Sequence, residues 1–429
     1  ASPTGEVLGL LPLSGAARAR GVPGAFPPVR RVLRAPPVPQ LFRLNAARNI
    51  FKGADRMTST PARPRELKPD LIRCVALFFV MGVHFYTHCD IYNAGYTGLA
   101  AILSELMRTL FIPALALFLM LSGYFQRGKR LSARYYLGIL RLLEMYFVCA
   151  VLNLLYTRFY LGVEMSARDF IGAIVNFTAT EYSWYILLYG GLFMLIPFLN
   201  LAYASLSCRG HKRILILSFF LLSSLPFSVL NTFVNLCAYW WQRIWPVMFY
   251  FMGAYIGEYR PEISVKKCAA WLLGALGVFT AFNYLVFDAS SPFYGHAAQS
   301  FLYTHEGLQN AVLTPLVFLF VMSLDVSRCP ARLARLIRTV AKYSYGAFLF
   351  SSITDSFVYG WLRRLVPVAG QRYLFFIVAL PLSYAAAVAL SALADRLVNV
   401  IDRALRPLMA KLFDRLYALI APDAAEEGK

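Results

Sequence analysis

The sequence predicts an all-α integral membrane protein, a bundle of about ten transmembrane helices with both termini in the cytoplasm. The first observation is composition: 59% of the 429 residues are hydrophobic and 15% are charged, whereas soluble domains are about a quarter charged. The second is a series of apolar segments, each long enough to cross a ~30 Å hydrocarbon core as a helix. These segments are residues 69–89, 99–124, 135–157, 183–203, 213–231, 240–258, 268–288, 306–325, 336–358 and 373–396.

Lysine and arginine in the connections predict the orientation of the bundle. Basic connections at 126–134, 208–213, 259–267 and 327–338 alternate with the connections 89–98 and 231–239, which contain neither residue. Because cytoplasmic loops carry the excess of Lys and Arg, these four loops and both termini are predicted to be cytoplasmic. Loop 361–372 departs from the pattern, with three arginines on the predicted outer side.

The net charge of +20 follows from these cationic loops, which would face anionic lipid. No basic stretch stands in a soluble domain, so we expect the lipid bilayer and not a nucleic acid as the partner of this charge. The oligomeric state cannot be read from the residues.

Both ends of the chain differ from the predicted membrane domain, residues 67–397. Residues 1–66 are rich in Pro and Arg, poor in acids, and predicted to be disordered. An Arg-rich leader can be a transit peptide, but its prolines favour translation upstream of a true start at Met57. Residues 398–429 form a basic tail with apolar positions at helical spacing, which predicts an amphipathic helix on the cytoplasmic leaflet.

Two further features bear on the outer side and on redox chemistry. Residues 161–182 are too polar to cross the membrane and predict a short interfacial helix. The seven cysteines include no CxxC pair, which argues against a disulfide framework and a thiolate metal site. Cys89 and Cys237 both fall near the predicted outer face, so one bridge between them stays open.

Two ionisable residues, Arg73 and His84, lie inside the first apolar segment. At ~100° per residue, eleven residues make three turns plus about 20°, so both side chains share one helix face about 16 Å apart. His88 extends the stripe toward the outer side. Ionisable residues at this depth are costly and normally line a cavity, and we expect Arg73 and His84 to face the same one.

These residue types suit acid–base chemistry on an anionic substrate. Imidazole is the side chain best able to take a proton from an alcohol near neutral pH. Guanidinium suits phosphate or a developing oxyanion. The structural alternative is that Arg73 snorkels to the headgroups and His84 is a polar residue satisfied between helices.

Four motifs occur in order along the predicted membrane domain. Ten residues separate Arg73 from His84, an apolar run at 112–125 contains Ser-Gly-Tyr, a Trp-Tyr pair opens 183–200, and 245–258 contains Gly-x-x-x-Gly. Each is weak alone. Together, over about residues 67–396, they resemble the membrane acyltransferase-3 family, whose signatures have this order and spacing.

Two positions depart from that family's pattern. Ser183 stands where many members carry a histidine directly before the Trp of the fourth span, and Ser351 stands where many carry one in the ninth. Neither position can supply an imidazole. A proton relay would therefore run through His84, either alone or together with His88.

The resemblance implies an O-acyltransferase in a multi-pass bacterial inner membrane. It would move an acyl group, most simply acetyl, from cytoplasmic acyl-CoA to a hydroxyl of a cell-surface polysaccharide or lipid-linked sugar. His84 would be the general base, or alternatively a nucleophile that is acylated transiently. Arg73 would hold CoA, which is a donor substrate and not a permanently bound cofactor, and no metal is expected. The basic residues Arg127, Lys129 and Arg130 could attract the CoA 3′-phosphate or only signal topology.

Six further side chains are candidates for substrate binding, each with a structural alternative. Gly123, between two of them, suits close helix packing; the Trp-Tyr pair suits an aromatic belt or a sugar platform; and Arg108 could pair with Glu105 or Glu144. The candidates are His88, Arg108, Ser122, Tyr124, Trp184 and Tyr185.

A transporter or flippase of lipid-linked glycan is the competing function. It would also have about ten spans and a basic cytoplasmic face, but it would need several acidic coupling residues within them. Apart from Glu105, Glu144 and Asp355 the spans offer few acidic residues, so the composition favours the enzyme.

Overall fold

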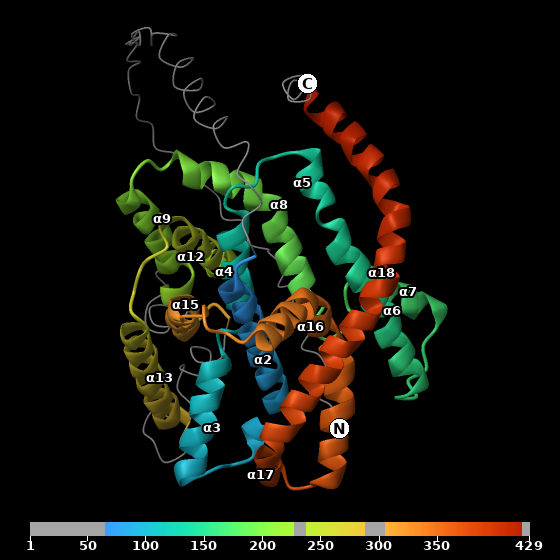
Figure 1. The fold of residues 1–429 in the computed structure, drawn as a ribbon. Helices are drawn as coiled ribbons and strands as arrows, with labels where there is room; N and C mark the ends of the chain where they lie inside the picture. The colour runs from blue at the N-terminus through green and yellow to red at the C-terminus, as the bar shows by residue number, and fades with distance from the viewer. Residues whose placement is uncertain (1–64, 227–236, 288–304, 423–429) are drawn as a thin grey trace, which may run out of the picture. The chain divides into compact units, whose positions relative to one another are not determined.

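The computed structural model describes residues 65–226, 237–287 and 305–422. The prediction for the leader falls almost wholly outside these residues. Within them the chain is helical and contains no β-strand, which confirms the all-α fold (Figure 1). The helices of at least eight residues are α2 Leu67–His88, α3 Gly98–Phe111, α4 Ala114–Gln126, α6 Leu140–Phe159, α7 Ala167–Val175, α8 Trp184–Ser205, α9 Arg209–Leu222, α12 Trp245–Tyr259, α13 Val265–Phe287, α15 Leu308–Ser323, α16 Ala331–Leu365 and α18 Phe376–Ile420. Shorter turns of helix are η2 Ile91–Asn93, α5 Ala133–Leu137, α11 Tyr239–Gln242, α17 Ala369–Arg372 and η4 Tyr373–Phe375.

Each predicted apolar segment contains a helix, but fewer than ten meet the length and hydropathy needed to cross a membrane alone. α12 has 15 residues and α15 has 16, which is shorter than the ~20 residues of a full span. The multi-pass membrane character is therefore plain, while the count of ten stays a prediction. Within the described ranges, the six helical segments that are long and apolar enough are Leu67–His88, Gly98–Gln126, Ala133–Phe159, Trp184–Ser205, Val265–Leu285 and Ala369–Ile420.

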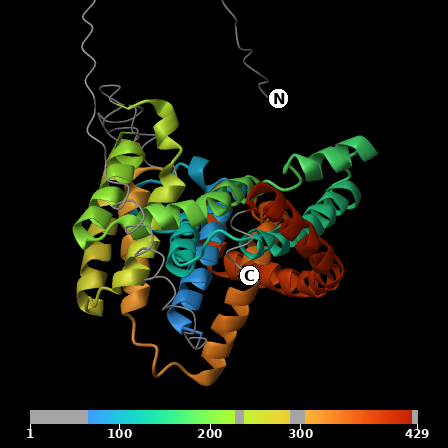
Figure 2. The ribbon, with the colours of Figure 1, turned by 90° about the horizontal axis from the view of Figure 1, so that it is seen from above.

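Helix α2 lies at the centre of the described bundle. Seen from above, it stands between a group containing α13 and α15 and a group containing α6, α16 and α18 (Figure 2). It packs against α16, α4, α18, α3 and α15. Its Ile72, Ala76, Leu77 and Met81 are fully buried, so the polar residues of α2 also face protein.

Helices α4 and α12 approach so closely that glycine is required on both. A Cβ on Gly123 would lie 1.9 Å from the Tyr250 carbonyl oxygen, and one on Gly253 would lie 1.9 Å from the Met120 carbonyl oxygen. Small residues permit this backbone contact in membrane proteins. The packing explanation of Gly123 is confirmed, and the contact fixes α4, which carries Ser122.

Arg372 explains in part why loop 361–372 departs from the charge pattern. Its guanidinium is 9% exposed and donates to the carbonyl oxygens of Val366, Pro367 and Cys89. This arginine therefore closes the chain around α17, and its charge is used within the protein. Cys89 is fully buried at the same place and forms no disulfide with Cys237 in the described part of the chain.

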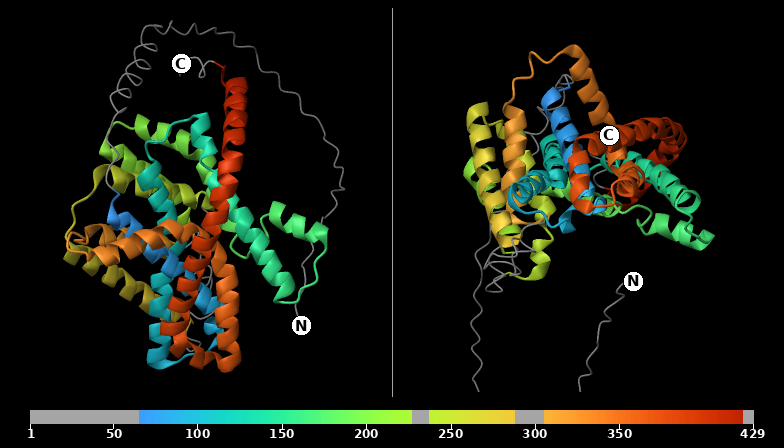
Figure 3. Two further views of the ribbon diagram at one scale, coloured as in Figure 1. Left: turned by 45° about the vertical axis from the view of Figure 1, so that its right-hand side comes forward. Right: turned by 90° about the horizontal axis from the view of Figure 1, so that it is seen from below.

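The predicted boundary between the membrane domain and the tail falls inside one helix. α18 runs unbroken for 45 residues, with Pro381 and Pro407 inside it. Its C-terminal part extends beyond the other described helices (Figure 3). In the connection 161–182, the short helix α7 is present, opened by a capping box of Ser166 and Asp169, and buries none of its residues.

Candidate active site

Arg73 and His84 share a face of α2, as their spacing predicts, but they line two different cavities. His84 lines a cavity of about 330 Å³, and Arg73 lines another of about 280 Å³. The expectation of a single cavity is therefore wrong. Eleven residues bring the helix nearly back into phase but also advance it by about 16 Å, and Phe348 of α16 lies between the two spaces, lining both. We call them the outer cavity, at His84, and the inner cavity, at Arg73.

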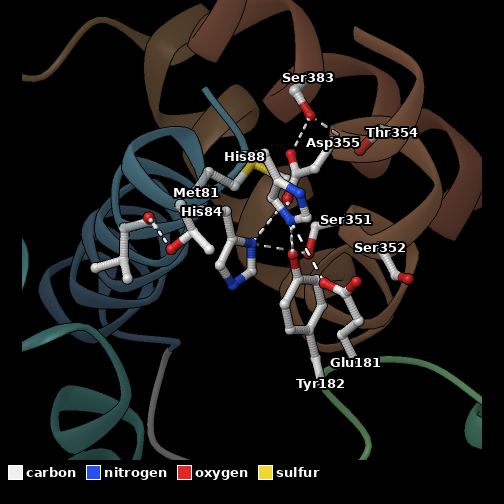
Figure 4. A network of polar contacts seen from close by, with 12 residues as sticks. Met81, His84, His88, Glu181, Tyr182, Ser351, Ser352, Thr354, Asp355 and Ser383 are labelled. Carbon is white, nitrogen blue, oxygen red and sulfur yellow. Dashed lines mark hydrogen bonds and ion pairs between the residues drawn. The ribbon is translucent and has the colours of Figure 1, made fainter. Parts of the chain in front are cut away.

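The His84 imidazole pairs with a carboxylate from a distant part of the chain. Its Nδ1 lies 2.7 Å from Oδ2 of Asp355 on α16, and the Asp355 side chain is fully buried (Figure 4). A carboxylate on Nδ1 holds the proton there, so Nε2 is the nitrogen left to accept a proton. The pair has the arrangement of a general base with its orienting acid.

The other oxygen of Asp355 is fixed by helix α18. Ser383 Oγ donates to Asp355 Oδ1 at 2.6 Å and lies 3.0 Å from Thr354 Oγ1. Hydrogen bonds to a charged acceptor are stronger than those between neutral groups. Three helices, α2, α16 and α18, therefore hold the pair in place.

Tyr182 sets the plane of the His84 ring. The two rings stack with centroids 3.8 Å apart and planes 6° apart. The Tyr182 hydroxyl lies 2.9 Å from His88 Nε2, which is also 3.5 Å from a Glu181 carboxylate oxygen. His88 thus contacts the Tyr182 hydroxyl. It is not among the described residues that line the outer cavity.

Ser351 stands where many members of the resembled family carry a histidine. Its Oγ donates to the Phe348 carbonyl oxygen at 2.7 Å and lies 3.4 Å from His84 Nδ1. Ser183, the other departure, is fully buried, with its hydroxyl 2.8 Å from Thr180 Oγ1. Ser351 therefore lies beside the His84 pair, whereas Ser183 serves the turn before α8.

The outer cavity combines one cation, one carboxylate and several aromatic rings. Arg108 lies over the Tyr92 ring at 4.2 Å, and its nearest guanidinium nitrogen is 3.6 Å from a Glu105 oxygen. Of the two partners predicted for Arg108, Glu105 and Glu144, the structure therefore shows Glu105. The cavity is lined among others by Arg108, Glu181, Tyr182, Trp184 and His305.

His305, a second imidazole in the outer cavity, is a poor candidate for the base. It stacks between Trp184, at 5.3 Å, and Trp245, at 5.9 Å. Burial lowers the pKa of His305 to about 4, because an apolar surrounding disfavours the charged form. The ring stays neutral in the physiological range and contributes an aromatic surface.

The inner cavity is lined by Arg73 and by hydroxyl and amide groups. Tyr185, only 6% exposed, has a hydroxyl with no hydrogen-bond partner among the described residues. Tyr189 accepts a hydrogen bond from Gln126 Nε2 at 2.9 Å. Ser122 also lines this space, so a polar, elongated ligand would find a cation and several hydroxyls here.

Arg73 is anchored at one nitrogen and open at the others. Its Nη1 donates to Asp70 at 2.7 Å, its guanidinium lies 4.9 Å from the Phe125 ring centroid, and its side chain is 29% exposed. Asp70 is 1% exposed and also pairs with Arg65 at 2.6 Å. The guanidinium is therefore preoriented toward the inner cavity, in which it can meet an anion.

The candidates from the sequence divide between the two cavities. Arg108 and Trp184 line the outer one, Ser122 and Tyr185 the inner one. Tyr124 lines neither, because its hydroxyl donates to Glu66 at 2.8 Å. No group of three His, Cys, Asp or Glu side chains in the described ranges could hold a metal ion.

Sequence reasoning missed the residues that hold Arg73 and His84 in place. Asp355 and Tyr182 contact His84, and Asp70 holds Arg73. Asp355 did carry a signal, since a carboxylate within an apolar segment is itself a functional candidate. Its pairing with His84, which is 271 residues away in the chain, carried no signal in the sequence.

A family comparison decides the class of protein. The model of an acyltransferase domain, that of the acyltransferase-3 family, matches residues 66–395. The chain belongs to the acyltransferase-3 family. The matched region includes Arg73, His84 and Asp355, and ends within α18. No curated protein and no solved structure matched the chain.

Membership of the acyltransferase-3 family supports the assignment of this protein as an acyltransferase. The site fits that class, because acyl transfer needs a base for the attacking group and positive charge for the tetrahedral oxyanion. The His84 pair can supply the first. Arg108, in the same cavity, can supply the second.

Proposed function

We propose that this acyltransferase moves an acyl group, most simply acetyl, from cytoplasmic acyl-CoA to a hydroxyl of a cell-surface polysaccharide or lipid-linked sugar. The topology that goes with it has ten spans, both termini in the cytoplasm, and a place in the bacterial inner membrane. The observation that carries the proposal is the 2.7 Å contact between His84 Nδ1 and the buried Asp355, beside a cavity of about 330 Å³.

In the proposed reaction, His84 Nε2 takes the proton of the acceptor hydroxyl as its oxygen attacks the thioester carbonyl carbon. The imidazolium that forms is stabilised by Asp355. When the tetrahedral intermediate collapses, the carbon–sulfur bond breaks and the CoA sulfur takes the proton back from Nε2. The products are the O-acyl ester and free CoA, and His84 returns to its starting state.

The outer cavity suits a sugar acceptor. Trp184, 40% exposed, offers an indole face beside His305, and aromatic faces stack on apolar ring surfaces. Arg108 and Glu181 line the same cavity and can hydrogen-bond hydroxyls. The acceptor would therefore be oriented with one hydroxyl toward His84.

The inner cavity suits the donor. Arg73 can bind a phosphate or an amide carbonyl of CoA, while Ser122, Tyr185 and Gln126 line the path that the arm would follow. With CoA phosphates at the Arg73 end, the pantetheine arm would cover the ~16 Å along α2 to His84. The basic loop 127–130 at the end of α4 would add to the attraction of the CoA phosphates.

The second mechanism has His84 acylated for a short time on Nε2 before the acceptor arrives. It would release CoA before the acceptor binds. Rapid quenching of enzyme with labelled acyl-CoA and no acceptor distinguishes the two, because only the nucleophilic route leaves label on the peptide that contains His84.

The proposed function is tested by incubating membranes with radiolabelled acetyl-CoA and following label into extractable glycan. Wild type should label the glycan and His84→Ala should not. His211→Ala is the matched control, because His211 is exposed on α9 outside the site, and it should label as wild type does. An unlabelled glycan in wild-type membranes, with intact donor recovered, would overturn the proposal.

A flippase for lipid-linked glycan is the second candidate, because a buried His–Asp pair can also carry a coupling proton. Figure 4 shows such a pair in a network that reaches Ser383 and His88. A flippase would move the glycan without attaching label to it. Unlabelled but translocated glycan, with a dependence on pH gradient, would favour this reading.

A further inference from the structure

Phe348 is the residue at which the inner and outer cavities meet. Among the residues that the structure describes, it alone lines both. The ring is 4% exposed and stands on α16, one turn before Ser351 and two before Asp355. Phe348 therefore forms a partition between the two cavities, and it stands on the same helix as Asp355.

Two tyrosines complete the partition. The Phe348 ring lies 5.4 Å from the Tyr185 ring at 71° and 5.9 Å from the Tyr182 ring at 39°. Tyr185 faces the inner cavity, and Tyr182 stacks on His84 in the outer one. Aromatic side chains thus fill the space between the Arg73 end and the His84 end.

The ring of Phe348 can move without breaking a polar contact. Its neighbours at the partition are rings, and each aromatic pair contributes only about 0.5–1.5 kcal/mol beyond its buried area. The two cavities on either side provide space for the displaced ring. By contrast, Tyr182 is tied to His88 by its hydroxyl, so Phe348 is the part of the partition that can yield.

We propose that Phe348 is the partition through which the thioester end of the donor passes, and that its size limits the length of the acyl group transferred. The inference rests on the proposed function, because it assumes that the donor occupies the inner cavity. In the closed position the ring separates the cavities. An acetyl group is short enough to pass beside the displaced ring, whereas each added methylene must share the space that the ring needs.

Acyl-chain selectivity tests the inference. The measurement is kcat/KM for acetyl-, butyryl- and hexanoyl-CoA with purified protein in lipid vesicles. Phe348→Ala should raise the ratio of hexanoyl to acetyl transfer at least about tenfold, the smallest discrimination that one methylene gives in a tight apolar pocket. Phe348→Leu has a smaller but still apolar side chain and should raise the ratio less. It can be measured in place of Phe348→Ala if the Ala variant folds poorly.

Phe350→Leu is the matched control. Phe350 is 1% exposed, lies on the same helix, and lines neither cavity. It should lose stability while keeping the wild-type acyl ratio. Equal ratios in wild type and both Phe348 variants would overturn the inference, and so would a Phe350→Leu ratio that shifts as much as theirs.

A second measurement does not need activity. Val83 lines the outer cavity and Leu121 the inner one, and each is replaced by cysteine in a separate variant. A small charged thiol reagent is added to the side from which Leu121→Cys reacts, and label at residue 83 is measured by mass spectrometry of the peptide. Val83→Cys should react from that side at least about tenfold faster when Phe348→Ala is also present.

The two experiments separate the inference from the proposed function. If wild type transfers no acyl group from any CoA thioester, the proposed function fails, and the labelling still decides whether Phe348 closes the passage. If wild type is active but Phe348→Ala changes neither the acyl ratio nor the labelling of residue 83, the partition inference fails alone.

Discussion

Asp355→Asn should reduce acyl transfer by about a thousandfold while leaving the binding of acyl-CoA unchanged. The substitution keeps the size of the side chain and removes only its charge, so His84 keeps a neighbour of the same shape at 2.7 Å. In the transition state the imidazolium would lose an anion about 4 Å from its charge centre. At an effective dielectric constant of ~20 such a pair interacts with about 4 kcal/mol, and each 1.36 kcal/mol is about tenfold in rate.

The assay is transfer of labelled acetyl from acetyl-CoA to extractable glycan at saturating donor, with kcat and KM measured separately. Ser383→Ala provides a graded comparison, because it removes one hydrogen bond to Asp355 Oδ1 and leaves the charge. A hydrogen bond to a charged group contributes about 1.5–3 kcal/mol, so the loss should be at most about a hundredfold.

Asp395→Asn is the matched control for removing a buried carboxylate. Asp395 is 9% exposed and pairs with Arg141 and Lys342 away from the site. It should lower thermal stability and keep the specific activity of the folded fraction. If Asp355→Asn, correctly folded, keeps more than about a third of wild-type kcat, the charge of Asp355 does not serve the reaction and the reasoning is refuted.

Three other outcomes are expected. His84→Ala should lose at least about a thousandfold in transfer and still insert and fold, because it removes a polar group from a cavity wall without burying a new charge; residual activity above a few per cent in the glycan assay would contradict its role as base. Arg73→Lys should raise KM for acetyl-CoA at least about tenfold, since a point charge bonded to Asp70 cannot also present a planar fork; an unchanged KM would limit Arg73 to supplying charge. His305 has a folded-state pKa lowered to about 4 from an unfolded value near 6.5, so its neutral burial contributes stability that is full above about pH 6.5 and lost as pH falls toward 4. Thermal unfolding from pH 7.5 to 4.5 should therefore fall less steeply in His305→Phe than in wild type, and parallel curves would contradict this.

The sequence was sufficient for the helices because membrane helices satisfy their own backbone hydrogen bonds. Length and hydropathy then locate them without any knowledge of neighbours. The same local signals could not decide the number of complete spans. α12, with 15 residues, owes its place to Gly253 against the α4 backbone, and that contact joins segments far apart in the chain.

Arg372 limits what charge counting can say about loop 361–372, for a similar reason. It treats each arginine as a solvated charge that reports the side of the membrane. Arg372 is instead buried against three carbonyl oxygens. A buried guanidinium that bonds carbonyls carries no topological information, and sequence alone does not separate it from an exposed one.

The candidate site shows where helical periodicity stops being informative. Periodicity predicts correctly that Arg73 and His84 share a face of α2, since that is a property of one helix. Whether the two side chains share a cavity depends on what other helices insert between them. Phe348 of α16 lies between them, and the sequence of α2 does not predict this.

The division of the site by Phe348 also explains why the chemistry is concentrated at one end of α2. The inner cavity carries Arg73 but no residue suited to be a base, while the outer cavity carries His84 with Asp355 behind it. A donor bound only in the inner cavity is thus separated from the base by an aromatic layer, and water that enters the inner cavity meets no activated base either. Transfer would then require the thioester to pass the layer first. On the proposed function, in which donor and acceptor lie on opposite sides of a membrane, this order would limit hydrolysis of the donor when no acceptor is present.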